Sequence, residues 1–350
     1  MRHLYPARKK RKSVGYIVVL ILIGLLFLGI FYGANYAWQI IAASRITTYV
    51  SRAEKFDINN RMNLLLLAVD APTLQEASRC DTIKLFSIEP KKPSITIMTI
   101  PRDSWVSPAG FPETKTKINA INNQMVSVHY GTPKLIETIE ELLGIKIHGY
   151  VKINYNGFIN VVDTIGGIDM NVEKPMHYVD TVDGYQIHID KGFQHLDGER
   201  ALQYVRFRSD ANADYAYWDG KVLGRSARQT EFIKALLNEM AKPSSWSKIP
   251  DAITATMQNV ETDIPMSEIF SFVEILRRVG TGSINEIPFP ATPDEVYDAW
   301  LDQMISILNV NRYELSLLVQ QHFIDHDETP PLVENLETTP DEDSSPEGEQ

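Results

Sequence analysis

The sequence predicts an α/β protein. Strand-like apolar segments and helix-like amphipathic segments follow one another in turn through the middle of the chain, and such alternation is typical of α/β folds. The chain has 350 residues, of which 23% are charged and 44% hydrophobic, and a single cysteine, Cys80. This composition excludes collagen, coiled coil, wholesale disorder and an intramolecular disulfide framework. We expect one core domain over residues 62–323.

A membrane-spanning helix is predicted before this domain. Residues 1–13 are rich in Lys and Arg, and no further charge occurs until Arg45. The apolar residues 14–38 are long enough, as a helix, to cross a hydrocarbon core of about 30 Å, whereas a cleaved signal peptide has a shorter apolar region. Basic flanks stay in the cytoplasm. We therefore expect a single-pass protein of the cell membrane with cytoplasmic residues 1–13 and an extracytoplasmic domain. The basic cluster is short and lacks interleaved aromatic residues, so nucleic-acid binding is not expected.

After a polar connector at 44–61, three strands are predicted. Residues 63–69 form a continuous apolar run, as in a strand covered on both faces. Residues 82–88 and 94–100 alternate between apolar and polar side chains, and the Pro-containing segment 89–93 forms the turn between them.

Helices and short strands then alternate. Thr132 is expected as an N-cap with Pro133 at the first helical position, and Gly144 ends that helix. A strand over 150–153 and a helix over 156–165 follow.

The remaining elements are a strand over 168–172 and a helix over 197–205, whose first residue is a capping aspartate. The segment 206–208 is expected to be extended, and 223–241 to be a long amphipathic helix. Residues 249–323 show helical segments and a Pro-rich loop without an assignable motif.

The end of the chain is acidic. Residues 325–350 hold ten Asp or Glu and no Lys or Arg, and account for most of the net charge of -11. This segment has too little apolar surface to offset the entropy cost of ordering, so we expect a disordered, solubilising tail.

Two carboxylates are candidate metal ligands. Asp70 follows the first buried strand, at the edge where open α/β sheets bind ligands. Asp81 begins the next strand, so an antiparallel pairing would bring both acids to that edge. Paired carboxylates suit Mg²⁺. The alternative is that each aspartate merely caps a turn or loop.

Arginines supply a candidate phosphate clamp. Arg206 and Arg208 are two residues apart, which in an extended segment directs both to one face. Arg225, Arg228 and Gln229 have the spacing of one helix face. Guanidinium groups match phosphate oxygens in pairs, so a converging set would hold a phosphate or diphosphate.

Arg102, which follows the strand over 94–100 and precedes Asp103, extends this set. A single arginine pair would be weak evidence, since most surface arginines are solvated or bound to neighbouring acids.

Seven motifs occur in a fixed order along the chain: LLLAVD (65–70), RCDT (79–82), IPRD (100–103), KINA (117–120), VDTIGGID (162–169), LDGERALQYVRFR (196–208) and GRSARQ (224–229). With the preceding membrane segment, they resemble the LytR-CpsA-Psr (LCP) family. An ordered set of this kind is far more specific than any one motif.

The resemblance implies a three-layer α-β-α domain with a central mixed sheet. It also implies an extracytoplasmic, Mg²⁺-dependent phosphotransferase that moves a glycopolymer from a polyprenyl-pyrophosphate carrier to peptidoglycan, forming a phosphodiester. Asp70 and Asp81 would be associated with Mg²⁺, and Asp70 or Asp103 would accept the proton of the attacking hydroxyl. The diphosphate would be bound by Arg79, Arg102, Arg206, Arg208, Arg225, Arg228 and Gln229.

The chain departs from the family pattern at two places. AVDAP at 68–72 lacks the basic residue that usually follows the first aspartate. The segment between Arg208 and Arg225 is long and aromatic, and its Tyr215, Tyr217 and Trp218 either cover a lipid or sugar or pack on their own domain.

Two other functions remain open at this stage. The same residues would serve a hydrolase that uses water as acceptor, and a catalytically silent wall-binding scaffold is the alternative outside enzymes. His148, His177, His188 and His195 lack a metal-ligand spacing and are interpreted as surface or core residues.

Overall fold

The computed structural model describes residues 60–71, 74, 78–179, 184–207, 216–218, 221–246, 248, 251, 255–256, 258–265, 268, 275, 278, 284–298 and 302–324. The expected membrane segment at 14–38, nearly all of the connector and the acidic tail at 325–350 lie outside these residues. Within the described part, no helix has the length and apolar character that a membrane crossing requires.

A mixed sheet forms the centre of the domain, as expected. Among the described residues it has six strands in the order β13-β6-β1-β2-β3-β14. The pairs β1·β2, β2·β3 and β6·β13 are antiparallel, whereas β1·β6 and β3·β14 are parallel. The strands are β1 (Met62–Val69), β2 (Cys80–Glu89), β3 (Ser94–Ile100), β6 (Gly149–Ile153), β13 (Val260–Thr262) and β14 (Ile284–Ile287).

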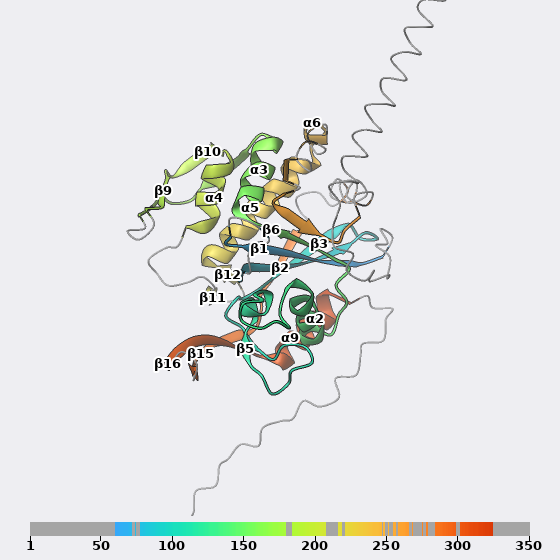
Figure 1. The fold of residues 1–350 in the computed structure, drawn as a ribbon. Helices are drawn as coiled ribbons and strands as arrows, with labels where there is room; N and C mark the ends of the chain where they lie inside the picture. The colour runs from blue at the N-terminus through green and yellow to red at the C-terminus, as the bar shows by residue number, and fades with distance from the viewer. Residues whose placement is uncertain are drawn as a thin grey trace, which may run out of the picture. The chain divides into compact units, whose positions relative to one another are not determined.

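One face of the sheet is covered by the 3-10 helix η1 (Ile118–Asn122), α2 (Thr132–Leu143) and α9 (Arg312–His322) (Figure 1). Leu65 and Leu85 of the sheet belong to the same buried cluster as Leu135 of α2 and Leu315 of α9. Burial of such side chains contributes roughly 1.5 to 3 kcal/mol each, so this layer anchors the sheet.

The opposite face carries α3 (Tyr155–Ile165), α4 (Gly198–Arg206) and α5 (Gly224–Ala241) (Figure 1). The Asn154 side chain accepts a hydrogen bond from Gly157 N at 2.9 Å and caps α3. Asp197 caps α4 as predicted, accepting from Arg200 N at 2.9 Å. These caps fix the starts of the helices that bound the site, and the three α-β-α layers are complete.

Short paired strands and one short helix, α6 (Pro243–Trp246), complete the described elements. The pairs are β4 (Trp105–Val106) with β5 (Thr116–Lys117), β7 (Ile168–Val172) with β10 (Gly192–Leu196), β8 (Met176–Val179) with β9 (Gln186–Ile189), β11 (Ala216–Trp218) with β12 (Lys221–Leu223), and β15 (Ala291–Asp298) with β16 (Gln303–Val310).

The structure corrects the predicted start of α2. Gly131 is the N-cap and Thr132 is already helical. The Thr132 hydroxyl instead donates to Asn122 Oδ1 at 3.0 Å and accepts from Lys152 Nζ at 3.1 Å. The Thr132 hydroxyl, which the local pattern assigned to helix capping, thus makes tertiary hydrogen bonds.

Two further predictions differ from the fold. The sequence predicted an extended segment from Arg206, but Arg206 is the last residue of helix α4. Phe207 is the C-cap of that helix. Residues 249–323 contain β13, β14, β15 and β16 besides helix. Strands such as β14 are short and pair with β3, almost 190 residues earlier, so their local pattern carries little signal.

Candidate active site

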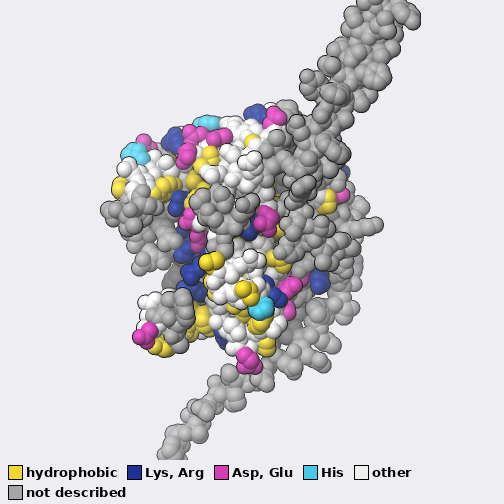
Figure 2. Space-filling view, viewed as in Figure 1, with side chains coloured by type: hydrophobic (Ala, Val, Ile, Leu, Met, Phe, Trp, Pro, Cys, Tyr) yellow, Lys and Arg dark blue, Asp and Glu magenta, His cyan; other side chains and the backbone are white. Residues whose placement is uncertain are grey.

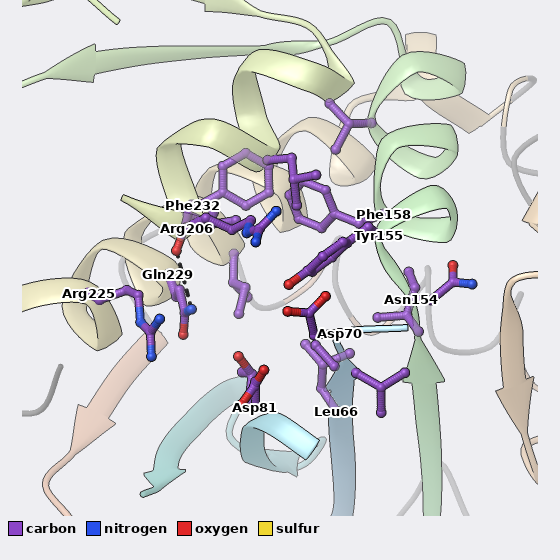
Figure 3. Close-up of a pocket in the computed structure, with 18 of the residues that line it drawn as sticks. Leu66, Asp70, Asp81, Asn154, Tyr155, Phe158, Arg206, Arg225, Gln229 and Phe232 are labelled. Atoms are coloured by element: carbon purple, nitrogen blue, oxygen red, sulfur yellow. Dashed lines mark hydrogen bonds between the residues drawn. The ribbon is translucent and has the colours of Figure 1, made fainter. Parts of the chain in front are cut away.

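A cavity of about 350 Å³ lies between the central sheet and helices α3, α4 and α5. Its polar end adjoins the carboxyl end of β1, and Figure 3 shows carboxylate, guanidinium and amide groups around it. Most of the remaining wall is aliphatic and aromatic. Its lining includes Leu66, Ala68, Ile153, Phe158, Val161, Val162, Ile187, Leu202, Val205, Phe232, Ile233 and Leu236.

Asp70 and Asp81 both line the polar end of this cavity (Figure 3). The antiparallel pairing of β1 with β2 is confirmed. The register shifts between Ala68 and Val69. Ala68 pairs with Thr82 and Val69 pairs with Cys80, so Asp81 has no partner residue on β1. A bulge of this kind redirects a side chain and is common beside functional sites. Here the structure brings the two carboxylates to one edge, as the sequence predicted.

Arg102 and Asp103 lie next to Asp81. Arg102 Nη1 donates to Asp81 Oδ1 at 2.7 Å, and Arg102 Nε is 3.6 Å from Asp103 Oδ2. Lys117 Nζ donates to Asp103 Oδ1 at 2.8 Å. The cavity wall includes Asp81 but neither Arg102 nor Asp103. Arg102 therefore orients a carboxylate of the site.

Arg206 lies between two tyrosine rings at the cavity. Its guanidinium carbon is 4.4 Å from the centre of the Tyr155 ring and 4.3 Å from that of Tyr185. Cation–π attraction to two rings restricts the position of the guanidinium, while its N–H groups remain suited to phosphate oxygens. The local sequence did not indicate these two tyrosines.

Tyr155 also connects Arg206 with Asp70. Burial raises the pKa of Tyr155 strongly; the Arg206 charge opposes this rise, and the hydrogen bond to Asp70 adds to it. Figure 3 shows the Tyr155 hydroxyl beside the Asp70 carboxylate. The phenol consequently keeps its proton at neutral pH, with its hydroxyl directed at the Asp70 carboxylate.

Helix α5 brings Arg225 and Gln229 to the cavity (Figure 3). Gln229 Nε2 donates to Val205 O at 3.4 Å, at the end of α4. Arg228 is not part of the cavity wall: its Nη2 donates to the carbonyl of Phe207. Of the three residues predicted to share one helix face, Arg225 and Gln229 line the cavity, whereas Arg228 contacts the end of α4.

Besides Arg102 and Arg228, two further expected arginines are not among the described residues of the cavity wall. Arg79 is exposed and is not in the cavity wall. Arg208 and Tyr215 lie outside the described residues, and for Tyr217 and Trp218 only the backbone of β11 is described. The predicted shared face of Arg206 and Arg208 stays a prediction.

The charge distribution favours an anionic ligand. In Figure 2, Lys and Arg side chains gather in a hollow of the surface between the β8–β9 region and the β15–β16 hairpin. Cationic side chains lining a hollow raise the local concentration of anions.

The sequence profile of the LytR_cpsA_psr family matches residues 35–321, which is most of the chain. The chain belongs to the LytR_cpsA_psr family. This confirms the resemblance carried by the seven ordered motifs.

Named relatives in this family are transferases. The Bacillus subtilis (strain 168) polyisoprenyl-teichoic acid–peptidoglycan teichoic acid transferase TagV is 28% identical over 304 residues, which is 82% of this chain and 74% of TagV. The protein named TagU, with the same activity in its name, from Oceanobacillus iheyensis is 31% identical over 210 residues, covering 59% of this chain and 60% of that one.

The fold is also that of a solved relative. The crystal structure of B. subtilis TagV is 26% identical, with a TM-score of 0.59, over 75% of this chain and 97% of the other. The LytR_cpsA_psr domain of this chain thus has the α/β architecture that its motifs implied.

The acidic end of the cavity fits Mg²⁺. Within the described part of the chain, no group of three or more His, Cys, Asp or Glu side chains is placed to hold a metal. Mg²⁺, however, is commonly held by one or two carboxylates, with water and substrate phosphate completing its ligands. Asp70 and Asp81 facing one cavity meet that requirement.

Lys84 is a buried residue of the cavity wall that sequence reasoning missed. Its side chain is 0% exposed, and its Nζ donates to Thr99 Oγ1 at 2.5 Å and to Thr230 Oγ1 of α5 at 2.8 Å. Burial lowers the pKa of Lys84 to about 8, although Glu286, 4.0 Å away, acts in the opposite direction. The sequence offered one sign of this buried lysine, which is its position between Ile83 and Leu85 in a predicted strand.

The single cysteine is not part of the cavity wall. Cys80 is fully buried, and desolvation raises the pKa of its thiol to about 12. Only the thiolate is a strong nucleophile. The chemistry of the cavity therefore belongs to oxygen and nitrogen groups.

Proposed function

We propose that this protein transfers a glycopolymer from a polyprenyl-pyrophosphate carrier to a sugar hydroxyl of peptidoglycan and forms a phosphodiester. The relatives named as teichoic acid transferases support this class of donor and acceptor.

The observation that carries the proposal is the two-part cavity. Its polar end combines Asp70 and Asp81 with Arg206, Arg225 and Gln229. Its other end is a wall of aliphatic and aromatic side chains from α3, α4 and α5. A charged diphosphate joined to an apolar chain has the same division, so one molecule would satisfy both ends.

In the proposed reaction, the acceptor hydroxyl oxygen attacks the phosphorus nearer to the glycan. A new P–O bond forms to the acceptor, and the bond from this phosphorus to the bridging oxygen breaks. The bridging oxygen leaves with the lipid as polyprenyl phosphate. Arg206 and Arg225 would bind the phosphate oxygens, whose charge shifts toward the leaving group, because preorganised cations stabilise such charge.

Asp70 and Asp81 would hold Mg²⁺, which when bound would neutralise phosphate charge. The proton of the attacking hydroxyl would pass to Asp70 and not to Asp103. Asp70 lines the cavity, whereas Asp103 is bound by Lys117 and lies outside the cavity wall.

The proposed setting is the outer face of the cell membrane. Residues 14–38 would anchor the chain and the basic residues 1–13 would remain in the cytoplasm. Protease added to intact spheroplasts should then digest the domain, and protection of the domain would contradict this topology.

Product analysis tests the activity. The full-length chain in detergent is mixed with a polyprenyl-pyrophosphate-linked glycan, with and without peptidoglycan, and the lipid and wall fractions are examined by mass spectrometry. We expect polyprenyl phosphate together with phosphodiester-linked glycan on the wall. Free glycan phosphate in place of the wall product would indicate a hydrolase, and unchanged donor in both samples would indicate a non-catalytic scaffold.

The matched variants for this assay are Asp81→Asn and Asp169→Asn. Asp81 lines the cavity, whereas Asp169 is an exposed aspartate that contacts His195. Turnover should fall in the first variant only.

A further inference from the structure

His177 and His188 face each other on the hairpin formed by β8 and β9. The two residues are direct partners in the antiparallel register, although eleven positions separate them in the chain. Both side chains are exposed. Sequence spacing alone therefore gave no sign that they form a pair.

The backbone brings these two side chains as close as a hairpin allows. The His188 N–H donates to Gln203 Oε1 on α4 at 3.2 Å. It therefore points away from β8, and His177 and His188 occupy a non-hydrogen-bonded pair. In such pairs the Cα atoms are about 4.5 Å apart and the side chains are closest.

The imidazole rings converge. The two Nδ1 atoms are 2.9 Å apart, the ring centres 4.4 Å apart, and the ring planes are inclined by 50°. In a head-on N–H···N bond, the distance between ring centres would exceed the nitrogen distance by two full ring radii. The observed difference is smaller, so the Nδ1 atoms lie off the line that joins the ring centres and the contact is not a head-on hydrogen bond. Two imidazole nitrogens this close can bind one ion after small side-chain rotations.

We propose that His177 and His188 form a two-imidazole chelate for a divalent transition-metal ion of the class to which Zn²⁺ belongs. Neutral imidazole is a preferred ligand of Zn²⁺, Cu²⁺ and Ni²⁺, and a poor one for Mg²⁺ and Ca²⁺. The described residues place no third His, Cys, Asp or Glu with this pair. Water would fill the remaining positions of the ion.

An ion at this site would tie together a hairpin that borders the cavity. The opposite face of the hairpin carries Ile187, which lines the cavity, and the ring of Tyr185, directly before β9, lies against Arg206. The metal site is separate from the carboxylates of the cavity, and its existence does not depend on the proposed transferase activity.

Zinc binding to the full-length chain tests the proposal. The protein is prepared in detergent without a polyhistidine tag and dialysed against Zn²⁺ at pH 7.5, with excess Mg²⁺ to occupy oxygen-only sites. Bound zinc is measured by elemental analysis. Zn²⁺ is the probe because neutral imidazole is among its preferred ligands.

We expect His177→Ala and His188→Ala each to bind one zinc ion fewer per chain than the wild type. His195→Ala is the matched control, because His195 is also exposed but pairs with Asp169 at 2.8 Å. It should bind as much zinc as the wild type. His177→Gln serves as a second variant if the alanine variant misfolds, as judged by circular dichroism. The extra zinc should also be lost at pH 5, since protonated imidazole does not bind metal.

Equal zinc binding by the wild type and both folded hairpin variants would overturn the proposal. So would loss of the same ion in His195→Ala, or its retention when only one of the two hairpin histidines remains.

Discussion

The guanidinium carbon of Arg206 lies 4.4 Å from the centre of the Tyr155 ring, and the hydroxyl of the same tyrosine lies beside the Asp70 carboxylate. One side chain at the start of α3 thereby sets the positions of a cation from α4 and an anion that follows β1. In the proposed reaction, the diphosphate would lie between these charges.

Tyr155→Phe should lower turnover while the fold is kept. The phenylalanine ring still stacks on Arg206 but cannot donate to Asp70. Loss of a hydrogen bond to a charged group costs about 1.5 to 3 kcal/mol, or roughly ten- to hundredfold in rate if the bond matters in the transition state. Tyr155→Leu, which also removes the stacking, should lose more. Turnover measured beside thermal unfolding separates the two effects, and wild-type turnover in Tyr155→Phe would contradict the role of this hydrogen bond.

Arg206→Ala should reduce turnover by about tenfold to a hundredfold, and Arg206→Lys should restore only part of it. Lysine keeps the charge but has neither the planar surface that stacks between Tyr155 and Tyr185 nor the paired donors of a guanidinium. Arg200→Ala is the control, since Arg200 lies on the same helix and contacts Gln194. Full activity of Arg206→Lys would show that charge alone suffices at this position.

Asp81→Asn should shift the Mg²⁺ dependence of turnover to higher concentration. The amide is a weaker ligand for a hard cation than the carboxylate and is similar in shape, so raised Mg²⁺ should restore part of the activity. The measurement is turnover across a Mg²⁺ titration, with Asp169→Asn as the exposed control. Identical titration curves for wild type and Asp81→Asn would remove Asp81 from the proposed metal site.

Lys84 should make the stability of the domain depend on pH in the alkaline range. Its pKa falls from 10.5 to about 8 on folding, so between these values the unfolded chain binds more protons than the folded one. Stability then rises with pH in this window, by about 1 kcal/mol per pH unit, as the buried ammonium loses its charge. Thermal unfolding from pH 7.5 to 9.5 should show this rise in the wild type relative to Lys84→Met.

The control for this comparison is Lys234→Met. Lys234 lies on α5, the helix that Lys84 contacts, but pairs with Glu231 at the surface at 2.8 Å. Its stability should follow the wild-type pH curve. Parallel curves for wild type and Lys84→Met would show that Lys84 does not titrate as its burial implies.

Local patterns determined the main elements of the fold. The apolar run in β1, the alternation in β2 and β3, and the Asp197 cap of α4 each depend on residues close together in the chain, so their period and capping chemistry are visible in the sequence. The proximity of Asp70 and Asp81 at one edge of the sheet was also predictable, because antiparallel pairing brings the end of one strand to the start of the next.

The tertiary structure decided which side chains meet. Arg228 and Gln229 are neighbours in the sequence, yet only Gln229 lines the cavity, because the approach of α4 determines what each side of α5 contacts. The stacking of Tyr155 and Tyr185 on Arg206, and the pairing of His177 with His188, join residues whose separation along the chain follows no motif. Such contacts depend on how helices pack and how a hairpin sets its register, and local periodicity carries no information about either.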